Sequence, residues 1–510
     1  MPGPIPVIDL FAGPGGLAEG FSQARDESGR RLFRVKLSVE KDLHAHRTLT
    51  TRAFYRQFET VPDDYYDYLK GNIGRDVLFQ RFPLEAKAAS EEAMCAELGK
   101  PWDDLQIEKR IHDALKGASH WALIGGPPCQ AYSLVGRSRR VNEDRAEFER
   151  DPRHTLYREY LKIIARHSPS IFVMENVKGM LSAKLDGRPV FDQILEDLTE
   201  PLRALGDSGL EFKYNIHSFF VDAGNSDVGR LEPADYVLKS EEFGVPQRRH
   251  RVILMGIRDD LGLTPPPNLV SRPAPSVGDV INDLPRLRSR LGARWGDDGD
   301  WKRVISNVIK EAASGIEGQN LRTRVLACIK ILEGRLPSEA REPSDDSPNA
   351  LEEWYSDPKL NVVLNHESRS HMPDDLARYM YCAVFAQVMG RPARIDEFPE
   401  RLIPAHRNAR AANAFVDRFK VQMQDGPSST ITSHISKDGH YFIHPDPAIA
   451  RSLTVREAAR LQTFPDNYLF EGPRTQQYHQ VGNAVPPYLA FQIAERVKMC
   501  LDGVSAYPGG

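Results

Sequence analysis

The chain has 510 residues, of which 41% are hydrophobic, 27% charged and 9% aromatic, a composition typical of a soluble globular protein of two to four domains. No stretch approaches the roughly 20 apolar residues of a membrane span. The N-terminal sequence MPGPIPVIDLF lacks the basic and long apolar regions of a signal peptide. The formal net charge of −4 does not exclude nucleic-acid binding, because such binding depends on local basic patches.

The cysteines, at positions 95, 129, 328, 382 and 500, form no CxxC pair and are odd in number. This pattern predicts a reduced, intracellular protein without a disulfide framework or structural zinc. Three basic patches occupy residues 137–153, 284–294 and 401–410. Each is either a contact for phosphate or a solvated helix face, and for the second and third patches both interpretations stay open.

Alternating strands and helices dominate the first half of the chain. Residues 5–11 predict a short buried strand, followed by a GPGG turn and a helix beginning near Leu17. Residues 33–40 predict a second strand, and residues 41–118 are mostly helical in pattern. Further strands are predicted at 120–126, 170–177, 212–223 and 251–258, with a helix at 157–167. This order predicts an α/β fold with a doubly wound, mostly parallel sheet.

The alternation ends near residue 264, where a proline-rich stretch begins. Residues 265–445 predict a second, smaller domain, between a first domain over 1–264 and a C-terminal segment over 446–510. That segment is predicted to contain a helix capped by Thr454, with Glu457 completing a capping box, and a final helix at 488–500.

Four polar or special residues come at or just after the carboxyl ends of predicted strands: Gly13, Glu40, Cys129 and Glu175. Ligands of open α/β sheets bind at that edge. The first loop, from Gly13 to Ala18, matches G-x-G-x-x-A, and Glu40 ends the next strand as a ribose-binding carboxylate does. These features predict a cofactor that contains adenosine, which could be NAD or S-adenosylmethionine. A purely structural turn without a bound cofactor is the alternative.

Cys129 follows two prolines that stiffen its loop. Arg137, Arg139 and Arg140 follow it closely, and positive charge favours the reactive thiolate, although a lone cysteine is usually an inert core residue. Glu175 lies at the mouth of an apolar strand, where burial raises the pKa of a carboxyl group. In an extended segment, Gln247, Arg249 and Arg251 share one face and could neutralise an anion; an exposed basic strand edge is the alternative.

Together, DLFAGPGGL, GGPPCQAYS, ENVKGM and PQRRHRV, in this order, closely resemble the DNA (cytosine-5)-methyltransferase family. RSLTVREAARLQTFPDNY and QVGNAVPPYLA fit the same family. The resemblance covers residues 5–46, 121–180, 243–258 and 427–490, and it implies a Rossmann-like, S-adenosylmethionine-dependent catalytic domain.

The resemblance assigns roles residue by residue. It implies that Cys129 is the nucleophile, Glu175 the partner of cytosine N3, and Arg249 and Arg251 a charge clamp. It implies a cofactor pocket formed by Phe11, Ala12, Gly13, Gly15, Leu17, Glu40, Pro127, Asn483 and Val485. It also implies DNA contacts by Gln130, Ser133, Arg137, Arg139 and Gln247. The family's acidic contact to adenine has no clear counterpart between Glu40 and Cys129, and Asp113 is one candidate among several.

These residue types suit the implied chemistry. A thiolate added to C6 makes cytosine C5 nucleophilic, and Glu175 and Arg251 would stabilise the charge that develops on the ring. A base inside a duplex must first be flipped out. The loop after Cys129 is then a lid, and residues 265–445 would read the target sequence. His434, His440 and His444 offer no fourth ligand nearby, and we expect no metal ion.

Other functions fit less of the sequence. An amino methyltransferase would place VPPY at its reactive loop, and an NAD-dependent oxidoreductase explains the first loop alone. A tRNA cytosine-5 methyltransferase of the same fold and an inactive DNA-binding regulator are further alternatives. The expected protein is a cytoplasmic, nucleoid-associated monomer that acts on double-stranded DNA. Any restriction or phage-defence partner is expected to be a separate chain.

Overall fold

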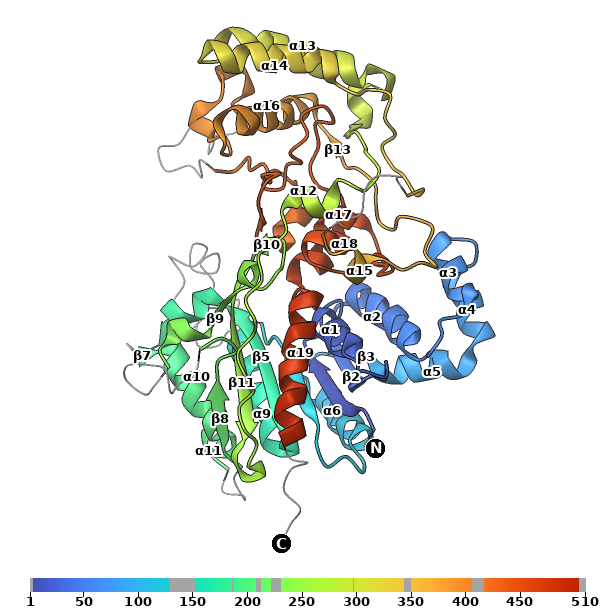
Figure 1. Ribbon diagram of the computed structural model, residues 1–510, viewed down its shortest axis with the longest axis vertical. Helices are drawn as coiled ribbons and strands as arrows, with labels where there is room; N and C mark the ends of the chain where they lie inside the picture. Colours follow the sequence, from blue (N-terminus) through green and yellow to red (C-terminus); the bar gives the residue numbers. More distant parts are fainter. Residues whose placement is uncertain are drawn as a thin grey trace.

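The computed structural model describes residues 3–128, 152–185, 188–207, 212–221, 231–296, 298–343, 350–405 and 417–503. Figure 1 shows a lower part built around a central sheet and an upper part built of helices. The polypeptide starts in the lower part, crosses to the upper part, and returns with its last helix to the sheet.

The central sheet contains eight strands, seven of which lie side by side, with β9 (Val237–Lys239) paired to β11 outside this row. In spatial order the seven are β3 (Ala93–Cys95), β2 (Phe33–Glu40), β1 (Ile5–Leu10), β4 (Ala122–Gly125), β5 (Ile171–Val177), β11 (His250–Arg258) and β8 (Tyr214–His217). The five strands from β3 to β5 pair in parallel, and β11 is antiparallel to β5, β8 and β9.

The predicted α/β fold with a mostly parallel sheet is therefore confirmed. Strands β1, β2, β4, β5 and β11 agree with their predicted positions to within two residues. The strand predicted at 212–223 is shorter, since β8 covers only Tyr214–His217. Because β11 runs against β5, its first residues meet the carboxyl end of β5, the edge at which parallel strands bind ligands.

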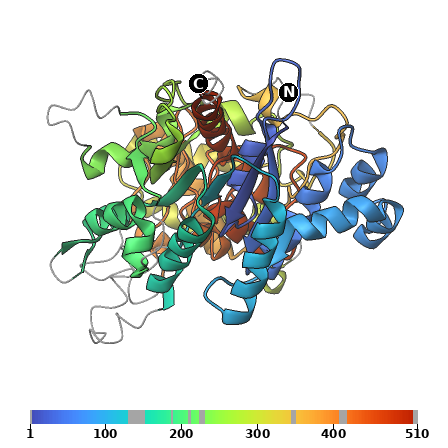
Figure 2. The same cartoon turned by 90° about the horizontal axis from the view of Figure 1, so that it is seen from below.

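Helices cover both faces of the sheet (Figure 2). On one face α1 (Gly16–Gln23) and α19 (Pro487–Asp502) bury Leu17, Phe21 and Leu489 against the strands. On the other face lie α6 (Pro101–Ala114), α9 (Pro152–His167), α10 (Val190–Thr199) and α11 (Pro201–Leu205). Two-sided burial explains why the central strands β4 and β5 begin as near-continuous apolar runs in the sequence.

The stretch after β2 is helical, as predicted. It contains α2 (Leu43–Arg56), α3 (Asp63–Lys70), α4 (Arg75–Arg81) and α5 (Pro83–Glu92). These helices enclose an aromatic cluster in which the rings of Phe54 and Phe79 stack with centroids 5.0 Å apart. The stretch ends in β3, a three-residue strand that the sequence analysis did not predict.

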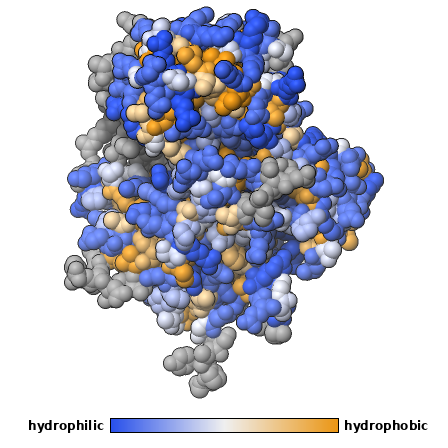
Figure 3. Space-filling model, turned by 45° about the horizontal axis from the view of Figure 1, so that its top comes forward, coloured by the Kyte–Doolittle hydropathy of each residue, from blue (hydrophilic) through white to orange (hydrophobic). Residues whose placement is uncertain are grey.

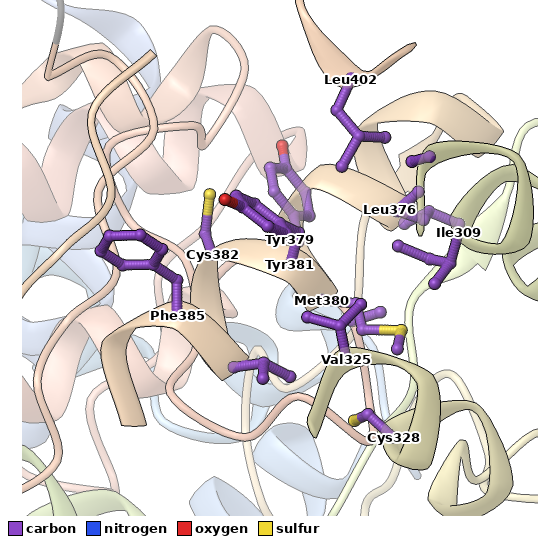
Figure 4. Close-up of a cluster of buried hydrophobic side chains, with 14 of the residues drawn as sticks. Ile309, Val325, Cys328, Leu376, Tyr379, Met380, Tyr381, Cys382, Phe385 and Leu402 are labelled. Carbon is purple, nitrogen blue, oxygen red and sulfur yellow. The ribbon is translucent and has the colours of Figure 1, made fainter. Parts of the chain in front are cut away.

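The upper part has a separate apolar core formed by α13 (Trp301–Ala312), α14 (Gln319–Ile331) and α16 (Pro373–Met389). Figure 4 shows Tyr379, Cys382 and Phe385 of α16 in this core, with Val325 and Cys328 of α14. The face shown in Figure 3 is largely hydrophilic, with hydrophobic residues scattered over both the upper and the lower part. The four described cysteines are all free, and no described helix has the length and apolar character needed to cross a membrane.

Short elements connect the two parts. They are α12 (Val277–Ile281), α15 (Glu352–Tyr355), α17 (Val455–Leu461), α18 (Arg474–Asn483), β10 (Gln247–Arg248) paired with β14 (Ser428–Ser429), and β12 (Arg290–Leu291) paired with β13 (Ser370–His371). A two-stranded hairpin, β6 (Lys184–Leu185) with β7 (Arg188–Pro189), precedes α10. The predicted capping box is confirmed: the Thr454 hydroxyl accepts from Glu457 N, and the Glu457 carboxylate accepts from Thr454 N.

Candidate active site

The glycine-rich loop after β1 is held by Glu40 at the end of β2. Gly13 N donates to Glu40 Oε2 over 2.8 Å, and Asp42 N donates to Glu40 Oε1 over 2.7 Å. Burial raises the pKa of the Glu40 carboxyl group. Gly13 and Gly15 have φ values of 58° and 97°, a backbone region that favours glycine. The structure thus brings the predicted loop and the predicted ribose-binding carboxylate together.

The C-terminal segment packs directly on this loop. A Cβ added at Gly16 would overlap the carbonyl oxygen of Val485, so only glycine permits this approach. The hydroxyl of Tyr468 donates to the carbonyl oxygen of Pro14. Asn483, the last residue of α18, is exposed, and its amide lies 3.2 Å from Nδ1 of His479. Val485 therefore reaches the glycine-rich loop from the far end of the chain, whereas the amide of Asn483 contacts His479 of the same helix.

The segment after β4 packs against Glu175 of β5. A Cβ added at Gly126 would lie 3.0 Å from Glu175 Oε2, and the Asn176 amide donates to the Pro127 carbonyl over 3.1 Å. The described chain stops at Pro128. Cys129, Gln130, Ser133, Arg137 and Arg139 lie outside the described residues, and so does most of the basic patch at 137–153.

An ion pair joins Glu175 to the start of β11. Arg251 Nε lies 2.8 Å from Glu175 Oε1, with side-chain exposures of 17% and 14%. Among the described residues Arg251 Nε has no hydrogen-bond partner, so its N–H is not aimed at the oxygen of Glu175. The carboxylate and the guanidinium thus form an acidic and a basic group side by side at the carboxyl edge of the sheet.

Arg249 lies close to this pair but is held differently. It is 3% exposed, and its Nη1 donates to the carbonyl oxygens of Ile431 (2.9 Å) and Gly482 (3.3 Å). Burial and the neighbouring Arg251 hold its pKa well below the usual value. The predicted continuous extension of residues 247–251 is interrupted here, because Arg249 N bonds back to Gln247 O in a tight turn between β10 and β11.

Gln247 is placed differently from its predicted role. The side chain is fully buried, its Oε1 accepts from Ile431 N over 2.6 Å, and its Nε2 donates to Leu461 O and Gln462 Oε1. All of its polar atoms therefore have protein partners. This arrangement does not favour the predicted contact of Gln247 with DNA.

The structure adds a residue that the sequence analysis missed. Strand β3 pairs in parallel with β2, with Cys95 opposite Glu40, so Glu97 follows at the same edge of the sheet. Lys41 and Lys100 bond to Glu97 over 3.1 and 2.5 Å and lower its pKa. Asp113 lies near the opposite end of α6, where it pairs with Lys116. A strand of three residues between helices leaves no periodic signal, which is why Glu97 was overlooked.

Arginines of the second basic patch bond within the protein. Arg286 pairs with Glu333 and Asp446, Arg288 is buried and donates to Gly334 O, and Arg290 pairs with Glu339. In the third patch Arg401 pairs with Glu311 and Asp374, and residues 406–410 lie outside the described part. These four arginines therefore support the fold of the upper part.

His440 and His444, which the sequence offered as metal ligands, contact other side chains. His440 Nδ1 lies 2.8 Å from the Tyr379 hydroxyl, and His444 Nε2 lies 3.7 Å from Glu457 Oε1. Burial lowers the pKa of His444 to about 4. Within the described part of the chain, no group of three or more His, Cys, Asp or Glu residues is placed to hold a metal ion.

Comparisons with known proteins show which family the chain resembles over most of its length. A family model described as C-5 cytosine-specific DNA methylase matches residues 100–499. A type II methyltransferase of Bacillus paralicheniformis is 35% identical, over 98% of this chain and 99% of that protein. The DNA (cytosine-5-)-methyltransferase M.ApeKI of Aeropyrum pernix is 25% identical over 98% of this chain and 99% of its own length.

A solved structure supports the fold. It is a proposed DNA modification methyltransferase encoded within an E. coli prophage, with a TM-score of 0.50 and 20% identity over 98% of this chain and 99% of that one. The family match spans most of the chain, and the first relative exceeds 30% identity over almost its whole length. The chain therefore belongs to the C-5 cytosine-specific DNA methyltransferase family.

Proposed function

We propose that this enzyme transfers a methyl group from S-adenosylmethionine to C5 of a cytosine in a specific duplex DNA sequence. One observation carries the proposal: the loop held by Glu40 and the Glu175–Arg251 ion pair lie at the same edge of the sheet. The first group suits an adenosine cofactor, and the second suits a base whose ring gains negative charge.

The residues near the loop fit the cofactor. Glu40 keeps a carboxylate beside the loop, where its free lone pairs could accept from ribose hydroxyls. Phe11, Ala12, Gly13, Gly15 and Leu17 would form the pocket, with Pro127, Asn483 and Val485 closing it. Glu97, at the end of the neighbouring strand, would accept from the adenine amino group. When bound, S-adenosylmethionine supplies an electrophilic methyl group.

The remaining residues would act on the base. Cys129 would add to C6 of a cytosine flipped out of the duplex, which makes C5 nucleophilic. After C5 takes the methyl group, a base would remove the C5 proton and the C6–S bond would break, which releases the Cys129 thiolate. Glu175 would hold a proton at N3, and Arg251 would donate to O2. Arg249 would keep positive charge beside the pair. The bond between Asn176 and Pro127 supports this assignment, because it fixes the chain two residues before Cys129 beside Glu175.

We further propose that residues 1–264 and 446–510 form the catalytic part and that residues 265–445 read the target sequence. Gln130, Ser133, Arg137 and Arg139 would contact the DNA, with the loop after Cys129 closing over it. Because the relative from Bacillus paralicheniformis is named a type II methyltransferase, a restriction-modification or phage-defence role with a separate nuclease is the proposed setting. One flipped base needs one site, so a cytoplasmic monomer on DNA is expected.

The decisive experiment is bisulfite sequencing of DNA from a host that expresses the chain, beside a host that expresses Cys129→Ser. The proposal expects methylated cytosines in one sequence context with the wild-type protein and none with the variant. S-adenosylhomocysteine should still bind the variant, since the thiol lies outside the proposed cofactor pocket. Methylation confined to tRNA, or an active Cys129→Ser variant, would contradict the proposal.

A further inference from the structure

Two buried glutamines connect the segment that leaves the upper part to the segment that covers the glycine-rich loop. Gln247 and Gln462 are both fully buried, and Gln247 Nε2 donates to Gln462 Oε1 over 2.9 Å. At one end Ile431 N donates to Gln247 Oε1 over 2.6 Å. At the other end Gln462 Nε2 donates to Val481 O over 2.6 Å and reaches Ala484 O at 3.4 Å.

Backbone groups at both ends fix the orientation of these amides. Ile431 offers an N–H, so the atom of Gln247 that faces it must be the oxygen. Val481 offers a carbonyl oxygen, so the atom of Gln462 that faces it must be the nitrogen. The nitrogen of the first amide then meets the oxygen of the second. The hydrogen bonds can therefore form in only one orientation of the two amides, from the N–H of Ile431 to the carbonyl oxygen of Val481. In that orientation each donor and acceptor of the series has a partner.

The segments at the two ends are also pressed together. Ile431 follows β14, which pairs with β10, and a Cβ at Gly482 would overlap the backbone of Thr432 and Ser433. Arg249 bridges the same two segments through Ile431 O and Gly482 O. Three residues beyond Gly482, the carbonyl of Val485 lies against Gly16 of the glycine-rich loop. A shift of residues 428–433 therefore cannot occur without disturbing residues 481–485.

We propose that Gln247 and Gln462 form an amide relay through which DNA on the upper part and a ligand in the cofactor pocket strengthen each other's binding. This inference rests on the proposed function and concerns how its two binding sites communicate. No water can replace these buried hydrogen bonds when they break. A displacement of residues 428–433 at one end therefore changes the hydrogen bonds that hold residues 481–485 at the other end. Both glutamines are positioning residues that contact neither ligand.

The test measures the coupling itself. Calorimetry gives the Kd of S-adenosylhomocysteine for the full-length protein, alone and with saturating unmethylated duplex DNA that the wild-type enzyme methylates. The wild-type Kd should be at least about fivefold tighter with DNA, within the usual range of coupling between sites. Gln247→Met and Gln462→Met should each reduce this ratio by at least about threefold. The double variant should reduce this ratio no further than either single variant does, because the two substitutions break the same series of hydrogen bonds.

Gln492→Met is the matched control, because Gln492 is 4% exposed and donates to Phe243 O and Tyr488 O outside the relay. It should keep the wild-type ratio. Equal wild-type Kd values with and without DNA, an unchanged ratio in both relay variants, or an equal loss in Gln492→Met would each overturn the relay. If the methionine variants do not fold, Gln462→Asn replaces them, since its shorter amide cannot reach both partners and should show the same loss.

The ratio of the two Kd values, without and with DNA, shows whether a failed test contradicts the relay or the proposed function. A wild-type protein that binds no S-adenosylhomocysteine, or methylates no DNA, contradicts the proposed function. A wild-type protein that does both, with relay variants that keep the full ratio, contradicts the relay alone.

Discussion

The side-chain amide of Asn176 donates to the backbone carbonyl of Pro127 over 3.1 Å, and its oxygen accepts from Val177 N over 2.8 Å. One buried side chain thus binds the end of β5 to the segment that leads into the predicted nucleophile. Gly126 packs against Glu175 beside this bond. The position of Pro127 relative to Glu175 therefore depends on Asn176, and removal of the Asn176 side chain should have a measurable consequence.

Asn176→Ala should lower kcat for methyl transfer by roughly 100-fold, because a misplacement of about 1 Å between reacting groups has an effect of that size. The Kd of S-adenosylhomocysteine should change much less than kcat, because Pro127 is only one of the residues proposed to close the cofactor pocket and, among the described residues, Asn176 makes no hydrogen bond to the glycine-rich loop. Single-turnover transfer to unmethylated DNA and calorimetry measure the two quantities. Asn215→Ala, at an exposed position in β8, is the control and should leave kcat unchanged. Equal kcat in both variants would refute a positioning role for Asn176.

Gly16→Ala should weaken cofactor binding, because the added Cβ forces the loop and the Val485 carbonyl apart. Overpacking of this kind also lowers the free energy of unfolding by about 1–3 kcal/mol. We expect the Kd of S-adenosylhomocysteine to rise at least about tenfold. Gly74→Ala, where a Cβ meets nothing within 4 Å, should leave Kd at the wild-type value. A wild-type Kd in Gly16→Ala would show that this contact has no part in binding.

Glu97→Gln tests whether the Glu97 carboxylate accepts a hydrogen bond from the adenine amino group of the cofactor. A hydrogen bond to a charged group contributes about 1.5–3 kcal/mol, so its loss should raise KM for S-adenosylmethionine by about 10- to 100-fold with little change in kcat. Asp113, the candidate named from the sequence, lies near the far end of α6, away from the sheet edge. Asp113→Asn should therefore keep the wild-type KM and kcat. Steady-state methylation at varied cofactor concentration distinguishes the two. A large effect at Asp113 and none at Glu97 would reverse the assignment.

Two buried histidines make the protein sensitive to acid. Burial lowers the pKa of His366 to about 4 and that of His371 to about 3. The unfolded chain binds protons at these groups near pH 6.5, whereas the folded protein does not, so stability falls as the pH drops below about 6.5 and continues to fall down to the folded pKa values. Between pH 7 and 5 the two together should lower the free energy of unfolding by roughly 4 kcal/mol.

Urea unfolding of wild type, His366→Gln and His371→Gln at pH 7 and pH 5 measures this effect. Each variant should lose roughly 2 kcal/mol of the wild-type pH dependence, the contribution of one buried histidine, while the rest, including that of His444, remains. The exposed His112 provides the control, and His112→Gln should keep the full dependence. The same pH dependence in all four proteins would mean that acid sensitivity arises elsewhere.

The sheet and the loop at its edge were predictable from the sequence, for a physical reason. Strand β1 is buried from Val7 to Leu10, and β2 is buried from Leu37 to Val39 after an alternating start, so each ends in a mostly apolar run. Gly13 and Gly15 mark the turn by their backbone requirements. Glu40 follows from its place at the end of the second run. These signals are local, and a single sequence contains them in full.

The role of Gln247 was not predictable in the same way. Its partners Ile431 and Gln462 are 184 and 215 residues away, and nothing in a local pattern shows that they converge on one glutamine. An amide next to two arginines resembles a DNA contact until its burial is known. Glu97 was missed for a different reason, because β3 has only three residues and owes its existence to the exposed edge of β2.

The packing of Val485 against Gly16 also has a consequence for synthesis. At about 5–20 residues per second, the ribosome adds the intervening residues in roughly half a minute to a minute and a half. Throughout that interval the glycine-rich loop and the inner face of α1 lack the surface that covers them. The N-terminal half of the nascent chain therefore carries exposed apolar surface until the last helix arrives, and we expect chaperones to bind it there more than they bind a protein whose contacts are local.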